Sequence, residues 1–167
     1  TWNKQSKPYE FSKNGPITFF EAPVTTTNTI AIDKSTEFST VRLCYTNYYS
    51  EGLLPNSSLK KDNLTLNGTW NITKKLTATG TANYIKQKGK GRNATGYNGN
   101  IATNFRQWQQ TQLDFKELKT AYELTRRNLT WNYNSALNYP IYSNNPYWDA
   151  YENYETDERT RFIGNAS

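Results

Sequence analysis

Aromatic and acidic side chains gather near residue 150, and both types could bind a ligand. Tyr147, Trp148 and Tyr151 are close in sequence, and a flat apolar ring face could stack on the C–H surface of a sugar. The same rings could instead pack the loop or lie at a membrane interface, and we favour either of these over sugar binding. Carboxylates from Asp149 to Glu158 supply oxygen ligands of the kind that Ca²⁺ prefers, but they lack the compact spacing of a calcium loop. We therefore expect solvated charge here, and the sequence predicts no metal and no cofactor.

Catalytic chemistry is not indicated elsewhere in the chain. Its single cysteine is Cys44, and there is no histidine to activate a thiol as a nucleophile. Two carboxylates can cleave a glycosidic bond, but nothing in the sequence indicates a buried acid beside an ionised partner. We expect Cys44 to pack within a strand, and we predict no enzyme.

The elements that must position these residues begin with two alternating segments, 63–72 and 76–84, separated by a short polar break. A period of two predicts strands with one apolar and one polar face. Each run has about ten residues, which is enough for a tilted strand to cross a bilayer. The predicted lumen-facing residues are Asn63, Thr65, Asn67, Thr69, Asn71, Thr77, Thr79, Thr81 and Asn83, and the predicted lipid-facing residues are Leu64, Leu66, Trp70, Ile72, Leu76, Ala78 and Ala82.

Composition and charge narrow the class of protein. The chain is 35% hydrophobic, 20% charged and 15% aromatic, and its formal net charge is +6. The basic residues are spread along the chain rather than gathered in a block, so we predict no nucleic-acid partner. A composition rich in Asn, Thr, Gly and Tyr is typical of barrel walls and long loops. The alternative is a secreted soluble β-sandwich that binds glycans or mediates adhesion, because its strands would alternate in the same way.

The predicted order is a linker over 1–22, four strands over 23–86, a long loop over 87–158 and the start of a further strand over 159–167. Short connections at 33–36 and 73–75 alternate with longer ones, as in outer-membrane barrels. Five strands cannot close a barrel, and an open edge in lipid leaves backbone groups unsatisfied. We therefore predict an all-β transmembrane antiparallel barrel, of which this chain is a fragment, with a helical extracellular loop.

Apolar residues inside the long loop recur at helical spacing and predict helix at about 101–126. Asp114 is a candidate N-cap, so the segment could instead form two helices, at about 101–110 and 114–126. We expect Asn145-Pro146 to end any helix. An apolar stripe on such a helix would cover the barrel rim or contact a partner. The candidate residues for contact with substrate or partner are Phe105, Trp108, Phe115, Tyr122, Tyr147, Trp148 and Tyr151.

Several stretches of the chain occur together and in a fixed order in one known family. They are Phe19–Phe20, Val41–Asn47, Glu51–Ser57, Asn63–Asn67, Lys74–Leu76, Phe105–Trp108, Asn145–Trp148 and Asp157–Asn165. With these residues the chain resembles the SusC/RagA family of TonB-dependent outer-membrane transporters. The last two stretches are the most specific, because both their residues and their spacing match the family.

The resemblance implies the first strands of a barrel of about 22 strands, just after the plug domain. It further implies a place in the bacterial outer membrane and import of oligosaccharides or peptides under a SusD-like surface lipoprotein. The other implied partners are outer-membrane lipid, the remainder of the barrel, and TonB acting through a plug segment that this sequence does not contain. The polar turn at 33–36 departs from the family, in which we would expect a glycine-rich turn.

Overall fold

The computed structural model describes residue 6 and residues 8–97 and 99–167. Two compact units are present. The sheet unit comprises Pro23–Glu51, Ser58–Lys90 and Thr156–Ser167. The loop unit comprises the described residues up to Ala22 together with Gly52–Ser57 and Gly91–Glu155.

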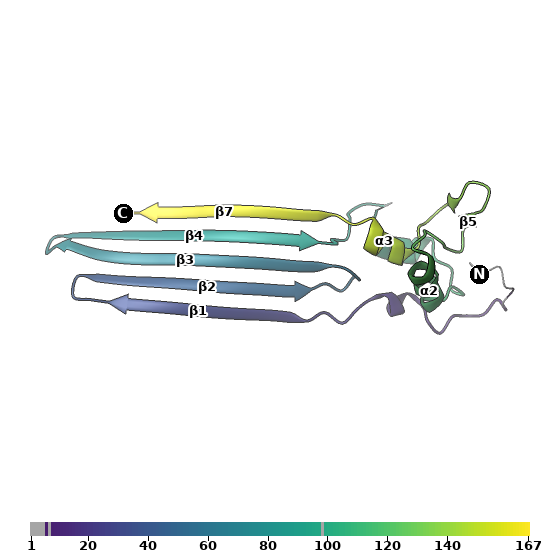
Figure 1. Ribbon diagram of the computed structural model, residues 1–167, viewed down its shortest axis with the longest axis horizontal. Coiled ribbons are helices and arrows are strands. Elements are labelled where there is room, and N and C mark those ends of the chain that lie inside the picture. The colour runs from purple at the N-terminus through teal and green to yellow at the C-terminus, as the bar shows by residue number, and fades with distance from the viewer. Residues whose placement is uncertain (1–5, 7, 98) are drawn as a thin grey trace. The chain divides into compact units, whose positions relative to one another are not determined.

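The sheet unit is a single antiparallel sheet of five strands (Figure 1). The strands are β1 (Thr25–Ser35), β2 (Ser39–Glu51), β3 (Ser58–Thr73), β4 (Leu76–Lys90) and β7 (Thr156–Ala166). Their order across the sheet is β1-β2-β3-β4-β7, so neighbours in sequence are neighbours in space. In the described residues β1 and β7 are the two edges, and the sheet does not close on itself. An antiparallel β-rich fold is therefore confirmed.

Most of the strands are longer than the sequence predicts, and the predicted turn at 33–36 is wrong. Asp33 lies within β1 opposite Arg42, and the side chains of this cross-strand pair approach to 3.6 Å. Opposite charges across a strand pair favour continued pairing, so polar residues that resemble a turn extend the ladder. The chain reverses at 36–38 instead, where the Thr36 backbone N–H donates to Ser39 O at 2.7 Å. The turn at 73–75 lies close to its predicted place, because β3 ends at Thr73 and β4 begins at Leu76.

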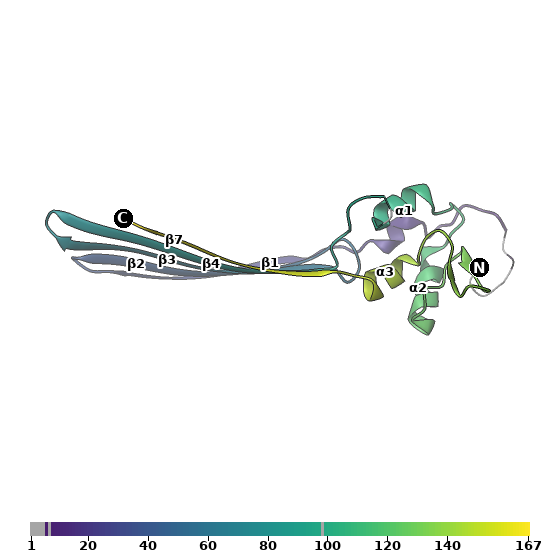
Figure 2. The ribbon, with the colours of Figure 1, turned by 90° about the horizontal axis from the view of Figure 1, so that it is seen from above.

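The register of β3 and β4 separates the two sets of alternating residues. Leu66 lies opposite Ala82, and Thr65 lies opposite Asn83. Residues directly opposite in an antiparallel pair share a face, and successive residues alternate between faces. The predicted lipid-facing and lumen-facing sets therefore lie on opposite faces of the sheet, which Figure 2 shows as one twisted layer. What each face contacts stays a prediction.

The loop unit contains short helices and one small hairpin. They are the 3-10 helix η1 (Pro16–Phe19), α1 (Ile101–Gln107), α2 (Phe115–Thr125), α3 (Pro146–Glu152) and the paired strands β5 (Tyr133–Asn134) and β6 (Tyr139–Pro140). The segment expected to be helical at about 101–126 contains two helices, close to the predicted division at 101–110 and 114–126. Asp114 caps the second, as predicted, and its carboxylate accepts from the Lys116 and Glu117 N–H groups at 2.9 and 3.2 Å.

A further helix, α3, begins at the place where the sequence predicts that helices end. Asn145 is its N-cap and Pro146 is its first residue, with the Asn145 side chain accepting from the Tyr147 N–H. Proline is well tolerated at the first helical position, because that N–H has no partner within the helix. No helix among the described residues runs through Asn145-Pro146, which agrees with the prediction, but sequence reasoning missed that the same pair starts a helix.

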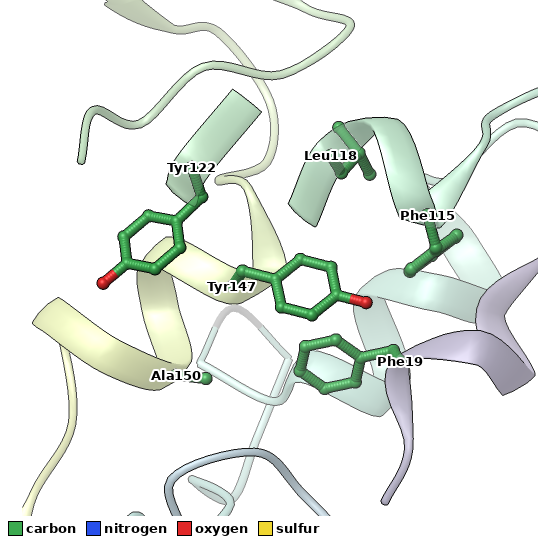
Figure 3. Packing of buried hydrophobic residues seen from close by; sticks show 6 residues of the cluster. All are labelled: Phe19, Phe115, Leu118, Tyr122, Tyr147 and Ala150. Carbon is green, nitrogen blue, oxygen red and sulfur yellow. The ribbon is translucent and has the colours of Figure 1, made fainter. Parts of the chain in front are cut away.

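The hydrophobic core of the loop unit is a cluster of side chains from η1, α2 and α3 (Figure 3). Its buried members are Phe19, Phe115, Leu118, Tyr122, Tyr147 and Ala150. The Phe19 ring meets those of Tyr147 and Phe105 edge-on, with centroids 5.0 and 5.1 Å apart. Phe19 comes from the segment 1–22 that the sequence predicts as a linker, so part of that segment packs into a core.

Candidate functional site

Three of the seven predicted contact residues lie inside the core of the loop unit. Phe115, Tyr122 and Tyr147 are 0%, 2% and 3% exposed. The Phe115 ring packs edge-on against Phe105 at 5.0 Å, and the Tyr122 ring stacks on Tyr151 at 5.6 Å. Burial raises the pKa of the Tyr147 phenol to about 12. These side chains support packing, and a ligand could reach them only if the core opened.

The other four residues lie nearer the surface. Phe105, Trp148 and Tyr151 are half-buried against the core. Trp108 is exposed, and its ring is parallel to that of Tyr142 at a centroid distance of 6.3 Å. The ring of Trp131 continues the row, 6.4 Å from Tyr142. Sequence reasoning missed Tyr142 and Trp131, because only the fold brings them beside Trp108. Exposed rings of this kind could stack on an apolar sugar face.

Asn145 holds the start of α3 in place. Its side-chain amide is buried and donates to Leu118 O and Leu129 O, both at 2.8 Å. Its carbonyl oxygen accepts from the Tyr147 N–H at 2.9 Å, and its own N–H donates to Asn128 Oδ1 at 2.8 Å. A buried amide with all these bonds made fixes three segments of backbone relative to one another. Asn145 thereby positions Tyr147 and Trp148.

A cavity of about 250 Å³ with both polar and apolar lining residues lies within the loop unit. Its lining includes Leu54, Arg92, Asn144, Asp149 and Tyr154. Asp149 accepts hydrogen bonds from the Asn144 and Asn153 side-chain amides at 2.7 and 3.1 Å. Burial raises the pKa of this carboxyl, and the two amides oppose that rise. Ligand pockets typically measure about 300–1,000 Å³, so this cavity suits a small polar group.

The apolar face of the sheet is a second candidate surface, and it belongs to the sheet unit. Leu66 and Trp70 are 41% and 43% exposed there, and Ile32, Tyr84 and Phe162 are also exposed. All the buried hydrophobic residues among those described belong to the loop unit. An exposed apolar face of this kind is typical of a surface that contacts either lipid or another protein.

Comparison with known proteins adds no family to this description. Protein-family models, curated proteins and solved structures gave no match to the chain. In the part of the chain that the structure describes, no three His, Cys, Asp or Glu side chains gather closely enough to hold a metal ion. Within the same residues, no helix has the length and apolar character needed to span a membrane.

Proposed function

We propose that this chain forms wall strands and an extracellular loop of a TonB-dependent outer-membrane importer of the SusC/RagA type. Such an importer would take up oligosaccharides or peptides and work with a SusD-like surface lipoprotein. The observation that carries the proposal is a sheet with two unlike faces. One face is apolar and exposed, and the other is largely Asn and Thr. Lipid is the natural cover for the first, and a water-filled lumen suits the second.

The lengths of the strands support a membrane span. The shortest strands of the sheet, β1 and β7, have 11 residues, and β3 has 16. A tilted strand needs about 9–11 residues to cross the hydrocarbon core of a bilayer. Strands of soluble domains are shorter, with a mode of about 5–6 residues. Every strand of this sheet is therefore long enough to cross.

The small residues of the apolar face favour lipid over a second protein layer. Gly68 and Gly80 lie opposite each other, and Ala82 lies opposite Gly164. The Trp70 ring covers Gly68, since a Cβ built on that glycine would be 2.3 Å from the indole. A protein layer would have to fill such a shallow surface with fitted side chains at crystal-like density. Mobile acyl chains adapt to it without that requirement.

The connections of the sheet differ between its two ends. Short turns at 36–38 and 74–75 join β1 to β2 and β3 to β4, whereas Gly52–Ser57 and Gly91–Glu155 follow β2 and β4. Outer-membrane barrels have short periplasmic turns and longer extracellular loops. The loop unit accordingly belongs on the outer side of the cell in this proposal. The open edges of β1 and β7 would pair with the remainder of the barrel, since unpaired backbone groups in lipid cost several kcal/mol each.

Fractionation of the full-length protein from its native cells tests the membrane location. The protein should stay with the membranes after a carbonate wash and should dissolve only in detergent. Recovery in the soluble fraction without detergent would contradict the proposal and favour the soluble β-sandwich. In that fold a second sheet would cover the apolar face.

Cysteine labelling tests the two faces separately. The variants Leu66→Cys and Thr65→Cys are made with Cys44 replaced by alanine, and each is assembled in lipid vesicles. A reagent dissolved in the lipid should label the cysteine at 66, and a water-soluble maleimide should label the cysteine at 65. The two positions are adjacent on β3, so they form a matched pair. The opposite labelling pattern would show that the faces are assigned the wrong way round.

A further inference from the structure

A second cavity, of about 100 Å³, lies on the polar face of the sheet. It is lined by Lys61, Ile85, Gln87, Arg159 and Arg161, all from the sheet unit. Lys61 lies opposite Gln87, and Gln87 lies opposite Arg159, so these residues form one row across β3, β4 and β7. Arg161 lies opposite Ile85 in the next row. The register thus brings three cationic side chains from two strands around one hollow.

Acidic side chains do not neutralise these three cations. Among the described residues, Lys61, Arg159 and Arg161 make no ion pair and no side-chain hydrogen bond. Asp157 shares this face of β7 but lies opposite Gly89 and does not line the cavity. On the other face of the same strands, by contrast, the Lys86 ammonium lies 2.8 Å from a Glu158 carboxylate oxygen. The three cations of the polar face therefore lack the carboxylate partner that Lys86 has on the other face.

The spacing of the three cations suits one anionic group. Two strand separations place the Lys61 and Arg159 backbones about 10 Å apart, and two residues along β7 separate Arg159 from Arg161 by about 7 Å. Long side chains on such a triangle can converge on a group held above Ile85 and Gln87. A guanidinium presents two parallel N–H donors that match the two oxygens of a carboxylate. Gln87 adds a neutral amide beside them.

We propose that this cluster is a binding site for the carboxylate groups of an acidic oligosaccharide, such as a uronic acid oligomer, on the lumen wall. The inference rests on the proposed function, because the polar face lines the path of a ligand only if the sheet is a barrel wall. A sugar chain fits the surroundings, since the neighbouring polar face offers Asn and Thr groups to its hydroxyls. The cluster would select acidic ligands over neutral ones of the same length.

Calorimetric titration of the detergent-purified full-length protein tests the site. The probes are a uronic acid trimer, a neutral sugar trimer and triglutamate. The uronate trimer should bind at least about tenfold more tightly than the neutral trimer, because charge-assisted hydrogen bonds add to its affinity. The double variant Arg159→Gln/Arg161→Gln should lose about that factor for the uronate and little for the neutral trimer. The Kd should also rise with salt.

Two further variants separate the site from general effects of charge or folding. Lys60→Gln/Lys88→Gln removes two charges from the opposite face of the same strands and should leave the uronate affinity unchanged. Arg159→Lys/Arg161→Lys keeps the charge and should retain more of the uronate affinity than the glutamine variant. Each variant is used only if its barrel shows wild-type heat-modifiable mobility in gels.

Three outcomes would overturn the proposal. They are equal affinity for the uronate and neutral trimers, an equal loss in the Lys60→Gln/Lys88→Gln control, and tighter charge-dependent binding of triglutamate, which would assign the site to acidic peptides. Failure of the proposed function is seen separately in the fractionation experiment. A soluble protein with charge-dependent uronate binding would keep the site and lose only its place in a lumen.

Discussion

The loop unit and the sheet unit use aromatic residues in opposite ways. Phe115 and Tyr147 of the loop unit are buried against other rings of the same unit. Trp70 and Tyr84 of the sheet unit remain exposed on one apolar face. The loop unit therefore gains hydrophobic stabilisation from its own side chains, whereas the sheet unit must gain it from outside. A residue of one type has a different energetic role in each unit.

Because of this difference, a substitution in the core of the loop unit and one on the apolar face of the sheet should depend on different surroundings. Truncation in the loop unit leaves a cavity that surrounding side chains cannot fill, whatever solvent surrounds the protein. A charge placed on the apolar face of the sheet is costly only if lipid or another layer of protein covers that face. The effects of matched substitutions in the two units therefore measure whether the apolar face of the sheet is covered.

The largest effect is expected for Phe115→Ala. This side chain is 0% exposed in the core of the loop unit, and its removal should destabilise that unit by about 3–5 kcal/mol. Hydrogen exchange of the full-length protein should show lost protection in α2 and α3 and unchanged protection in β1–β4. Leu124→Ala on the same helix is the control, because Leu124 is 72% exposed and should change stability by less than about 0.5 kcal/mol. Equal losses in both variants would mean that this core does not stabilise the unit.

The next effect is expected for Leu66→Arg. If Leu66 faces lipid near the midplane, an arginine there should cost about 2–4 kcal/mol, whereas Thr65→Arg on the lumen side should be nearly neutral. Denaturant unfolding of the barrel in lipid vesicles measures both. Similar unfolding free energies for the two variants would remove the distinction between the faces, and with it the contrast between the units.

Local sequence patterns predicted the alternating faces and the cap of α2. Leu66 and Thr65 are assigned to opposite faces by an alternation of period two, which can be recognised from neighbouring residues alone. Asp114 was found because a capping carboxylate lies directly before the helix it caps. The strands nevertheless extend past their predicted ends, because cross-strand partners such as Asp33 and Arg42 continue the ladder. Such a partner is invisible until the register is known.

The features that the sequence did not reveal depend on distant contacts or on ambiguous signals. Phe19 is part of the core because its ring packs against those of Phe105 and Tyr147, which lie far from it in the sequence. Asn145 caps α3, yet a following proline is as good a signal for the end of one helix as for the start of another. Lys61 and Arg159 line one cavity only because β7 returns to pair with β4.

A smaller loss is expected for Asn145→Ala. The substitution leaves Leu118 O and Leu129 O without their buried donor and removes the cap of α3, for a loss of about 2–3 kcal/mol. Asn145→Ser keeps a capping acceptor and should recover about 1 kcal/mol. Hydrogen exchange at the first turn of α3 measures both variants. If serine recovers nothing, the cap contributes nothing and the two donated bonds account for the whole loss.

The smallest effect is expected for Asp149→Asn, and it depends on pH. Burial raises the pKa of Asp149 above its ordinary value of 3.8, so the folded loop unit binds this proton more tightly than the unfolded chain does. The resulting stabilisation is fully present below that ordinary pKa and is lost as pH rises through the raised pKa. Asparagine cannot ionise, and its Oδ1 can still accept from the Asn144 and Asn153 amides. The gain in stability of the variant over the wild type should therefore be absent below about pH 4 and should appear as pH rises through the raised pKa of Asp149, by less than about 1 kcal/mol. Urea titration of the loop unit's tryptophan fluorescence in the full-length protein measures this gain.

Glu123→Gln removes an exposed carboxylate from α2 and should show no such gain. If Asp149→Asn instead loses stability at every pH, the amide bonds to the carboxylate outweigh its burial. The hydrogen bonds of Asp149 to Asn144 and Asn153 would then stabilise the loop unit, as its aromatic core does.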